Sequence, residues 1–305
     1  MPGETQVERA PWVFLLGRPP MEGYLAFLQQ ASPGTNVDIP AAAQRWRQAA
    51  QLIDTLTISE AGAADNHAVE ALPVSLNAIA SDYLADPAVA ASYGVVPAQI
   101  GIVRLDDLVV YQRQVNLRYV SELRDMIGDW SIEDEKLLKF CLDIDQPSAD
   151  ISVYQSAPNA YTFRSVSTDA RFLGASLLDA SQVSGYVPQG RARYALVMYI
   201  GYGTNALNVV GINGRLILNN GSHRAYALRA AGLTHVPAVI QIATREDDLA
   251  IVQPVKQDLP LYLQNPRPPM LKDYFNDSLH EVVNAPLSSR QIMLQFGVDQ
   301  ADVPR

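Results

Sequence analysis

The sequence is poor in cysteine, in basic residues and in long apolar runs, and each shortage excludes a class of protein. A single cysteine, Cys141, cannot form an internal disulfide, so the chain fits a reducing compartment. The 23 Lys and Arg are outnumbered by 32 Asp and Glu, which makes nucleic acid a poor partner because such binding draws on clustered cations. No apolar run approaches the roughly 20 residues of a membrane span, and residues 1–9 lack the layout of a signal peptide. We therefore expect a cytoplasmic protein without a membrane partner.

Histidine is also scarce, and the common catalytic motifs are missing. The four histidines are His67, His223, His235 and His280. No two of them have the spacing of a metal site, so we predict no closed metal centre. The sequence has no Gly-x-Ser-x-Gly elbow, no Walker Gly-Lys-[Ser/Thr] and no Gly-x-Gly-x-x-Gly turn. A haem or iron site built from distant segments through His67 or His223 stays open, and with it an oxidoreductase of specialised metabolism.

What the chain does have is the composition of a globular protein, with 48% hydrophobic and 18% charged residues. Residues 18–142 are dominated by helical patterns, including one helix predicted over residues 109–127. Residues 143–148 are typical of a linker, and strand patterns follow at 151–154, 161–165, 194–201 and 292–298. The fold class predicted is mixed α/β. A helical part, residues 1–145, packs on a mixed-sheet part, residues 146–305, as two parts or one compact domain.

The tetrapeptide Arg-Pro-Pro-Met occurs twice, at residues 18–21 and 267–270. Proline is tolerated at the first helical positions because the N–H groups there have no intrahelical acceptor. The sequences on either side of the two copies do not align. We therefore interpret them as the starts of two independent helices and not as an internal repeat.

Residues 206–242 carry the densest chemistry in the chain. Asn213-Gly214 between two apolar runs predicts a hairpin. The second strand ends at Asn219-Asn220-Gly221, and a helix is predicted from about Ser222, with a buried strand following at 236–242. A glycine turn before a helix presents unpaired N–H groups and the positive end of the helix dipole, and both attract an anion.

This turn, Asn220-Gly221-Ser222-His223-Arg224-Ala225-Tyr226-Ala227, resembles the signature turn of the ParB/sulfiredoxin-like superfamily. In that superfamily a strand leads into a Gly-x-[His/Arg]-Arg-x-x-Ala turn that holds nucleotide phosphates. The triplet is Cys-His-Arg in sulfiredoxins, Glu-Arg-Arg in ParB-type partition proteins and His-His-Arg in related free-serine kinases. Here it is Ser222-His223-Arg224, and with Ser in place of Cys a thiol repair reaction at this position is excluded. The resemblance implies a ParB/sulfiredoxin-like element at about residues 194–245.

The sequence therefore predicts one site for a small anionic ligand, with a nucleotide or another phosphate compound as the expected class, and leaves the cofactor open, a nucleotide included. Arg224 would hold a phosphate or carboxylate, and His223 would act as general acid or base. The glycine-rich segment 201–205 and the polar segment 164–171 are candidate contributors from outside the turn, where Arg171 and Asp169 could also simply pair with each other. The catalytic candidates are Ser222, His223 and Arg224; the ligand-binding candidates are Asn219, Asn220, Gly221, Gly203, Asn205, Arg164 and Arg171.

A purely structural interpretation of the turn stays open beside the ligand site. Ser222 would then cap the helix, a contact that contributes about 1 kcal/mol, and Arg224 would pair with a carboxylate at the edge of the core. The leading function is an enzyme acting on a nucleotide or phosphate compound. The alternatives are a non-catalytic nucleotide sensor or partner-binding protein and the oxidoreductase above. Oligomeric state is left open, a homo-oligomer included.

Overall fold

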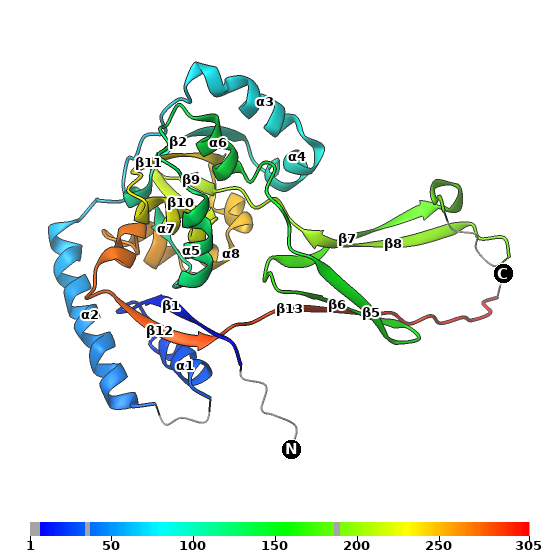
Figure 1. The fold of residues 1–305 in the computed structure, drawn as a ribbon, viewed down its shortest axis with the longest axis horizontal. Helices are drawn as coiled ribbons and strands as arrows, with labels where there is room; N and C mark the ends of the chain where they lie inside the picture. Colours follow the sequence, from blue (N-terminus) through cyan, green and yellow to red (C-terminus); the bar gives the residue numbers. More distant parts are fainter. Residues whose placement is uncertain (1–6, 34–36, 186–189, 305) are drawn as a thin grey trace. The chain divides into compact units, whose positions relative to one another are not determined.

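The computed structural model describes residues 7–33, 37–185 and 190–304, and the chain divides into two compact units (Figure 1). Unit 1 consists of Met1–Gln146 and Thr204–Leu287, and unit 2 of Pro147–Gly203 and Ser288–Arg305. The chain thus leaves unit 1 next to the sequence boundary drawn at residue 145. It returns to unit 1 at Thr204, so the predicted second part, residues 146–305, is distributed over both units.

Unit 1 contains the α-helices of the described residues, and short helical turns connect them. The α-helices are α1 (Glu22–Ala31), α2 (Ile39–Ser59), α3 (Asn77–Ala85), α4 (Pro87–Tyr93), α5 (Leu117–Met126), α6 (Glu135–Leu142), α7 (Ser222–Ala230) and α8 (Gln253–Gln257). The turns of this unit are η1 (Val74–Leu76), η2 (Leu105–Asp107), η4 (Glu246–Ile251), η5 (Pro260–Gln264) and η6 (Leu271–Phe275).

The strands of unit 1 form two sheets. The first has the order β12-β1-β4, with every pairing antiparallel, and the second has the order β2-β11-β9-β10-β3. In the second sheet β11 runs parallel to β9, and β10 runs parallel to β3, so this sheet is mixed. The strands are β1 (Arg9–Leu15), β2 (Ala98–Arg104), β3 (Val109–Val110), β4 (Gln114–Asn116), β9 (Asn208–Ile212), β10 (Arg215–Asn220), β11 (His235–Ile242) and β12 (His280–Pro286).

The five-stranded sheet is covered on both faces by apolar side chains. On one face Val209, Leu218 and Ile240 belong to the cluster that includes the inner sides of α5, α6 and α7. On the other face Val210 and Ile217 pack with residues of the segment from η4 to η5. The alternation of Val209 and Val210 between the two faces is that of a strand buried on both sides. The helix α7 therefore starts directly after β10, an inner strand of a sheet that is packed on both faces.

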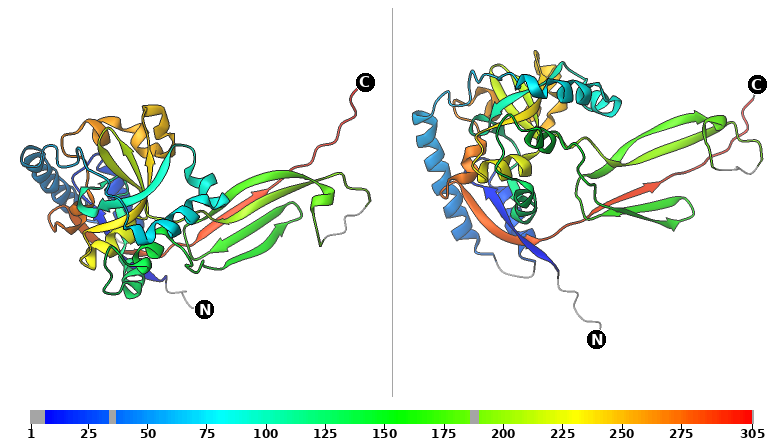
Figure 2. Two further views of the ribbon diagram at one scale, coloured as in Figure 1. Left: turned by 90° about the horizontal axis from the view of Figure 1, so that it is seen from above. Right: turned by 45° about the horizontal axis from the view of Figure 1, so that its top comes forward.

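Unit 2 consists of strands. The order β13-β6-β5 makes a three-stranded sheet, and β7 pairs with β8 in a two-stranded ribbon (Figure 2). Its elements are β5 (Ile151–Ala157), β6 (Ala160–Ser165), β7 (Ala170–Asp179), η3 (Ala180–Gln182), β8 (Tyr194–Tyr202) and β13 (Arg290–Gln295). The strands predicted at 151–154, 161–165 and 194–201 are confirmed, and the one predicted at 292–298 lies in part within β13.

The helix predicted over residues 109–127 is wrong in its first half. Val109 and Val110 form β3 and pair with Ile217 and Leu218 of β10. Val115 in β4 pairs with Val13 of β1, and only Leu117–Met126 is helical. Strand partners far away in the sequence supply the backbone hydrogen bonds here, so tertiary pairing overrides local helical preference.

The two Arg-Pro-Pro-Met segments, interpreted as independent, are in contact. The Arg18 guanidinium donates a hydrogen bond to the Arg267 carbonyl at 2.7 Å, and both arginines are buried. Arg267 in turn binds both carboxylate oxygens of Asp273. Only the first segment leads into an α-helix, α1; the second leads into the 3₁₀ turn η6. The shared motif thus builds one buried polar contact and not two separate helix starts.

The predicted mixed α/β class is confirmed by the helices and mixed sheets of the structure. Within the described ranges, every helix is too short or too polar to cross a bilayer.

Candidate functional site

The turn between β10 and α7 has a backbone that glycine alone fits well. Gly221 has a φ of 86°, in the left-handed region. A Cβ built on Gly221 would lie 3.0 Å from the Cα of Leu207, closer than side chains normally approach backbone. The predicted hairpin at Asn213-Gly214 and the predicted helix start at Ser222 are both confirmed. The positions of β10 and Leu207 therefore fix where α7 begins.

The helix α7 begins without a side-chain cap. Its N-cap position is Gly221, not Ser222, and no side chain accepts a hydrogen bond from the first-turn N–H groups in the capping position. The first N–H groups of a helix have no intrahelical acceptor. The backbone N–H groups of this turn and the positive end of the α7 dipole thus remain suited to an anion.

The two asparagines before Gly221 hold the turn in place. The Asn219 amide donates to the side-chain oxygen of Asn208 at 2.8 Å, and the Asn219 carbonyl accepts from the Tyr111 hydroxyl at 2.7 Å. The side-chain oxygen of Asn220 accepts from the Gly221 N–H at 2.8 Å, and its amide donates to the Thr204 carbonyl. The side chains of these two predicted ligand-binding residues are thus engaged in hydrogen bonds that hold the turn.

Arg224 points into the protein and is 4% exposed. Its guanidinium pairs with Asp143 at 2.5 Å, donates to the carbonyl of Asn205 and lies 5.4 Å from the centre of the Phe140 ring. Asp143 follows the last residue of α6, so a cation here also suits the negative end of that helix. The pairing is the one expected from the structural interpretation of the turn. One donor, the buried Nε of Arg224, has no acceptor within the described parts of the chain.

His223 connects α7 to the start of α5. Its Nε2 accepts a hydrogen bond from the backbone N–H of Asn116 at 3.0 Å, and its ring meets the edge of Tyr119 with centroids 5.3 Å apart. A neutral imidazole that accepts at Nε2 carries its proton on Nδ1. The geometry therefore selects one tautomer and presents Nδ1–H as the ring's donor.

The helices α5 and α7 lie side by side, in contact with each other (Figure 1). Asn116, the N-cap of α5, meets His223 in the first turn of α7, and further along Arg124 of α5 is close enough to Tyr226 for its charge to lower the pKa of that phenol. Burial is the larger influence and raises that pKa overall. The side chain of Asn116 caps α5 by accepting from two of its N–H groups. Two helix N-termini thus meet, and only that of α7 lacks a cap.

Three predicted site residues belong to unit 2 and make their contacts there. Arg164 donates to the side chain of Gln291 at 3.1 Å and lies over the Tyr154 ring. The Arg171 guanidinium packs so closely on Gly203 that a Cβ at Gly203 would overlap it. The glycine-rich segment begins inside β8, which continues to Tyr202. Asn205, in contrast, lies in unit 1 and contacts Arg224 through its carbonyl.

The structure adds residues that sequence reasoning missed. Asn116 and Tyr119 lie at the site because α5 begins at Leu117, and an asparagine ahead of a helical pattern is a recognised cap signal. Because a single helix was predicted over residues 109–127, Asn116 fell inside that helix and its cap signal was missed. Tyr111 and Asp143 reach the turn from distant positions in the sequence, and no local pattern marks them.

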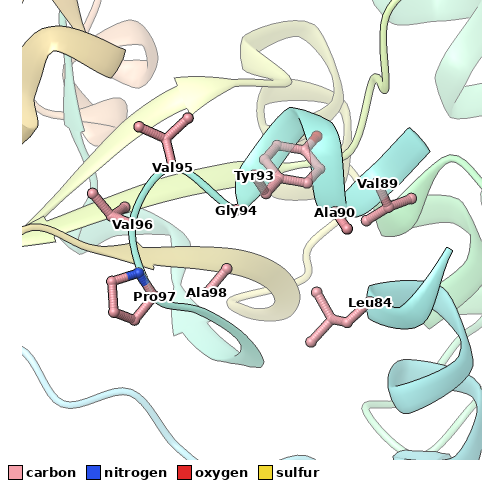
Figure 3. Close-up of a pocket in the computed structure, with 9 residues that line it drawn as sticks. All are labelled: Leu84, Val89, Ala90, Tyr93, Gly94, Val95, Val96, Pro97 and Ala98. Carbon is pink, nitrogen blue, oxygen red and sulfur yellow. The ribbon is translucent and has the colours of Figure 1, made fainter. Parts of the chain in front are cut away.

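A pocket of about 440 Å³ lies between α3, α4 and the segment that leads to β2 (Figure 3). Its walls are mostly apolar, and the hydroxyl of Tyr93, one of the lining residues, contacts the Thr204 carbonyl, which also accepts from Asn220. A second pocket, of about 490 Å³, includes Gly232, Leu233 and His235, beyond the C-terminal end of α7. Neither is lined by a residue of the turn, so neither pocket encloses the candidate site.

The remaining reactive side chains are held in protein contacts. His67 contacts Asp107 at 3.0 Å and the Ala63 carbonyl at 2.8 Å. Cys141 is buried, and burial raises the pKa of its thiol to about 12, so the thiol packs in the core as a neutral group. Within the ranges that the structure describes, His, Cys, Asp and Glu form no group of three that could hold a metal ion.

No protein-family model, curated protein or solved structure matches this chain. The resemblance of residues 220–227 to the ParB/sulfiredoxin-like turn therefore stays a prediction from the sequence.

Proposed function

We propose that the chain binds a small anionic molecule at the first turn of α7, with a nucleotide or another phosphate compound as the expected class. The observation that carries this proposal is the uncapped helix start at Gly221, placed beside the N-terminus of α5. The backbone N–H groups of Ser222 and His223 would contact the anion, and the helix dipole would favour its charge. The ParB/sulfiredoxin-like resemblance of the same residues supports a phosphate over other anions.

In this proposal Arg224 positions the turn and does not itself bind the ligand. Its pairing with Asp143 and with the Asn205 carbonyl fixes α7 against α6 and the segment before β9. The ligand would meet the backbone of the turn and the half-buried imidazole of His223. Such a site needs no deep cavity, because backbone donors at a helix end point outward along the helix axis.

An enzyme acting on the bound molecule is the leading form of the proposal, and His223 is the group able to exchange a proton with it. Acting as an acid or hydrogen-bond donor through Nδ1–H would leave the hydrogen bond from Asn116 to Nε2 intact. Acting as a base through Nε2 requires the hydrogen bond from Asn116 to open first. This engaged Nε2 is the specific observation that favours the second candidate, a non-catalytic sensor of the same class of ligand. Phosphate release by purified protein separates the two.

Titration calorimetry tests the proposal, with inorganic phosphate and ATP as the probes. We expect saturable binding of at least one probe, weakened at least tenfold in His223→Ala. His235→Ala is the matched control, since His235 contacts the Thr234 hydroxyl and lies beyond the other end of α7. Its affinity should stay within about twofold of the unsubstituted protein. Equal affinities of the two variants, or no binding by the unsubstituted protein, would contradict the proposed site.

A further inference from the structure

Unit 2, called the β-arm from here on, has no apolar core of its own. Its buried residues among those described are Ala160, Thr162, Ser165 and Ala170, all small or polar. The apolar clusters of the described chain are built from residues of unit 1. Strands gain stability by burying a face, and an isolated two-stranded ribbon is marginal in water. The β-arm therefore needs a surface to cover it.

The ribbon of β7 and β8 displays large apolar side chains on one face. Leu177 and Leu196 are directly opposite each other in the register and are 69% and 64% exposed. Tyr194, two residues from Leu196 and so on the same face, is 70% exposed. Together these side chains make a continuous apolar stripe, a feature that marks an interaction site in soluble proteins.

The outer edge of β8 carries no protection against pairing. The nine residues of β8 include no charged residue and no proline, and β7 is its only neighbour in the described sheet. Monomeric proteins usually blunt such edges with charges, prolines or bulges. The bulge in this ribbon lies in β7, between Phe172 and Gly174, and not in β8. The apolar stripe and the open edge thus meet along β8.

The distribution of charge favours a second copy of this chain as the partner. The β-arm contains six arginines and five aspartates, a net charge of +1, whereas the whole chain carries −9, which leaves −10 on unit 1. Two copies that met through unit 1 would bring like charges together. The nearly neutral β-arm is where two copies of this acidic protein can approach with little repulsion. A strongly charged partner, such as nucleic acid or an anionic membrane, would gain little from it.

Large apolar side chains are exposed over much of the β-arm. Fourteen of them in its described residues are at least 36% exposed, on both sheets and on residues 296–303. A standard protein interface buries about 800 Å² per partner, so a dimer of that size would draw on this wider apolar surface around the stripe.

We propose that this chain forms a homodimer through its β-arms. The stripe of Leu177, Leu196 and Tyr194 on one copy packs against the same stripe on the other, with β8 at the centre of the interface. Such an interface uses the same patch on both copies, as a two-fold dimer requires. Dimerisation is independent of the anion site, which lies in unit 1.

Sedimentation equilibrium of the full chain tests the proposal. The unsubstituted protein should be dimeric at micromolar concentration, and Leu177→Asp/Leu196→Asp should raise the dissociation constant at least 100-fold. Ile58→Asp is the matched control, because Ile58 is an 84% exposed apolar residue of α2 and its substitution should leave the dimer intact. Both leucines are exposed, so circular dichroism should show an unchanged fold. A monomeric unsubstituted protein, or a dimer that survives the double substitution, would overturn the proposal, as would binding of the arm to lipid vesicles or to another protein in place of a second copy.

Discussion

Arg224 shows how the environment decides what a residue does. In the sequence it stands in a triplet that resembles a phosphate-binding signature, and its planar fork suits a phosphate or a carboxylate equally. In the structure the carboxylate is internal: it belongs to Asp143, 81 residues away in the sequence, and only the fold brings the two side chains together. Of the triplet, His223 and the backbone around it are the parts that we propose meet the ligand.

The Arg224 pairing leads to a prediction about stability. Arg224→Ala should lower the free energy of unfolding by about 2–4 kcal/mol, because it leaves the carboxylate of Asp143 without its buried partner. Arg229→Ala is the control on the same helix. Arg229 pairs with Asp106 at 2.7 Å, but both side chains are about one quarter to one third exposed, so the loss should stay under about 1 kcal/mol.

Urea unfolding measures both variants against the unsubstituted protein, with the slope of the transition as a check that the unfolded states are comparable. Equal losses for the two arginines would mean that the Arg224 pair does not hold α7 in place. A small loss for Arg224→Ala together with a loss of phosphate binding would instead restore Arg224 as a ligand-binding residue.

At the scale of elements, the turn before α7 depends on one glycine. Gly221→Ala should cost about 2 kcal/mol or more, since alanine must adopt a left-handed φ and its Cβ would press against the backbone of Leu207. Gly232→Ala is the matched control: its φ of 93° is equally left-handed, but no atom lies within 4 Å of the added Cβ. Its cost should be about 1 kcal/mol.

Thermal or urea unfolding of the two variants isolates the contact with Leu207, because the backbone strain is common to both. Gly221→Ala should also reduce phosphate binding, whereas Gly232→Ala should not. If the two variants lose the same stability and keep the same affinity, the close approach at Gly221 has no role in shaping the site.

The elements that could be predicted from the sequence are those whose signals are local. The hairpin at Asn213-Gly214, the start of α7 and the strand β11 each follow from a turn residue or an apolar run within the element itself. The segment 109–116 could not be predicted, because its strands exist only through pairing with β10 and β1. Local preference favoured a helix there, but pairing with strands distant in the sequence makes the segment extended.

The candidate site divides in the same way. The turn from Asn219 to Arg224 could be found from the sequence, since a glycine before a helix is a local signal. Asn116 and Asp143 could not be assigned to it, because they arrive from separate elements. Gly203 is a candidate because it lies just ahead of the hairpin, and Arg164 and Arg171 because they lie in a polar segment, but all three make their contacts within unit 2.

At the scale of the whole molecule, the chain separates two tasks between its units. Unit 1 holds the apolar clusters, the mixed sheet and the helix start proposed to bind an anion. The β-arm holds exposed strands of nearly balanced charge and is proposed to join two copies. Sequence patterns identified several strands of both units, but they could not show which strands would lack a core, since that depends on how the strands are covered.

The central claim is that an anion binds at the first turn of α7, and backbone amide chemical shifts test it most directly. Isotope-labelled protein would be titrated with inorganic phosphate and then with ATP while the amide signals of Gly221, Ser222 and His223 are followed. The account predicts saturable shifts at these amides with a common affinity, and much smaller shifts at Gly232 beyond the other end of the helix. Saturation confined to other amides, or no saturable shift at the turn, would contradict it.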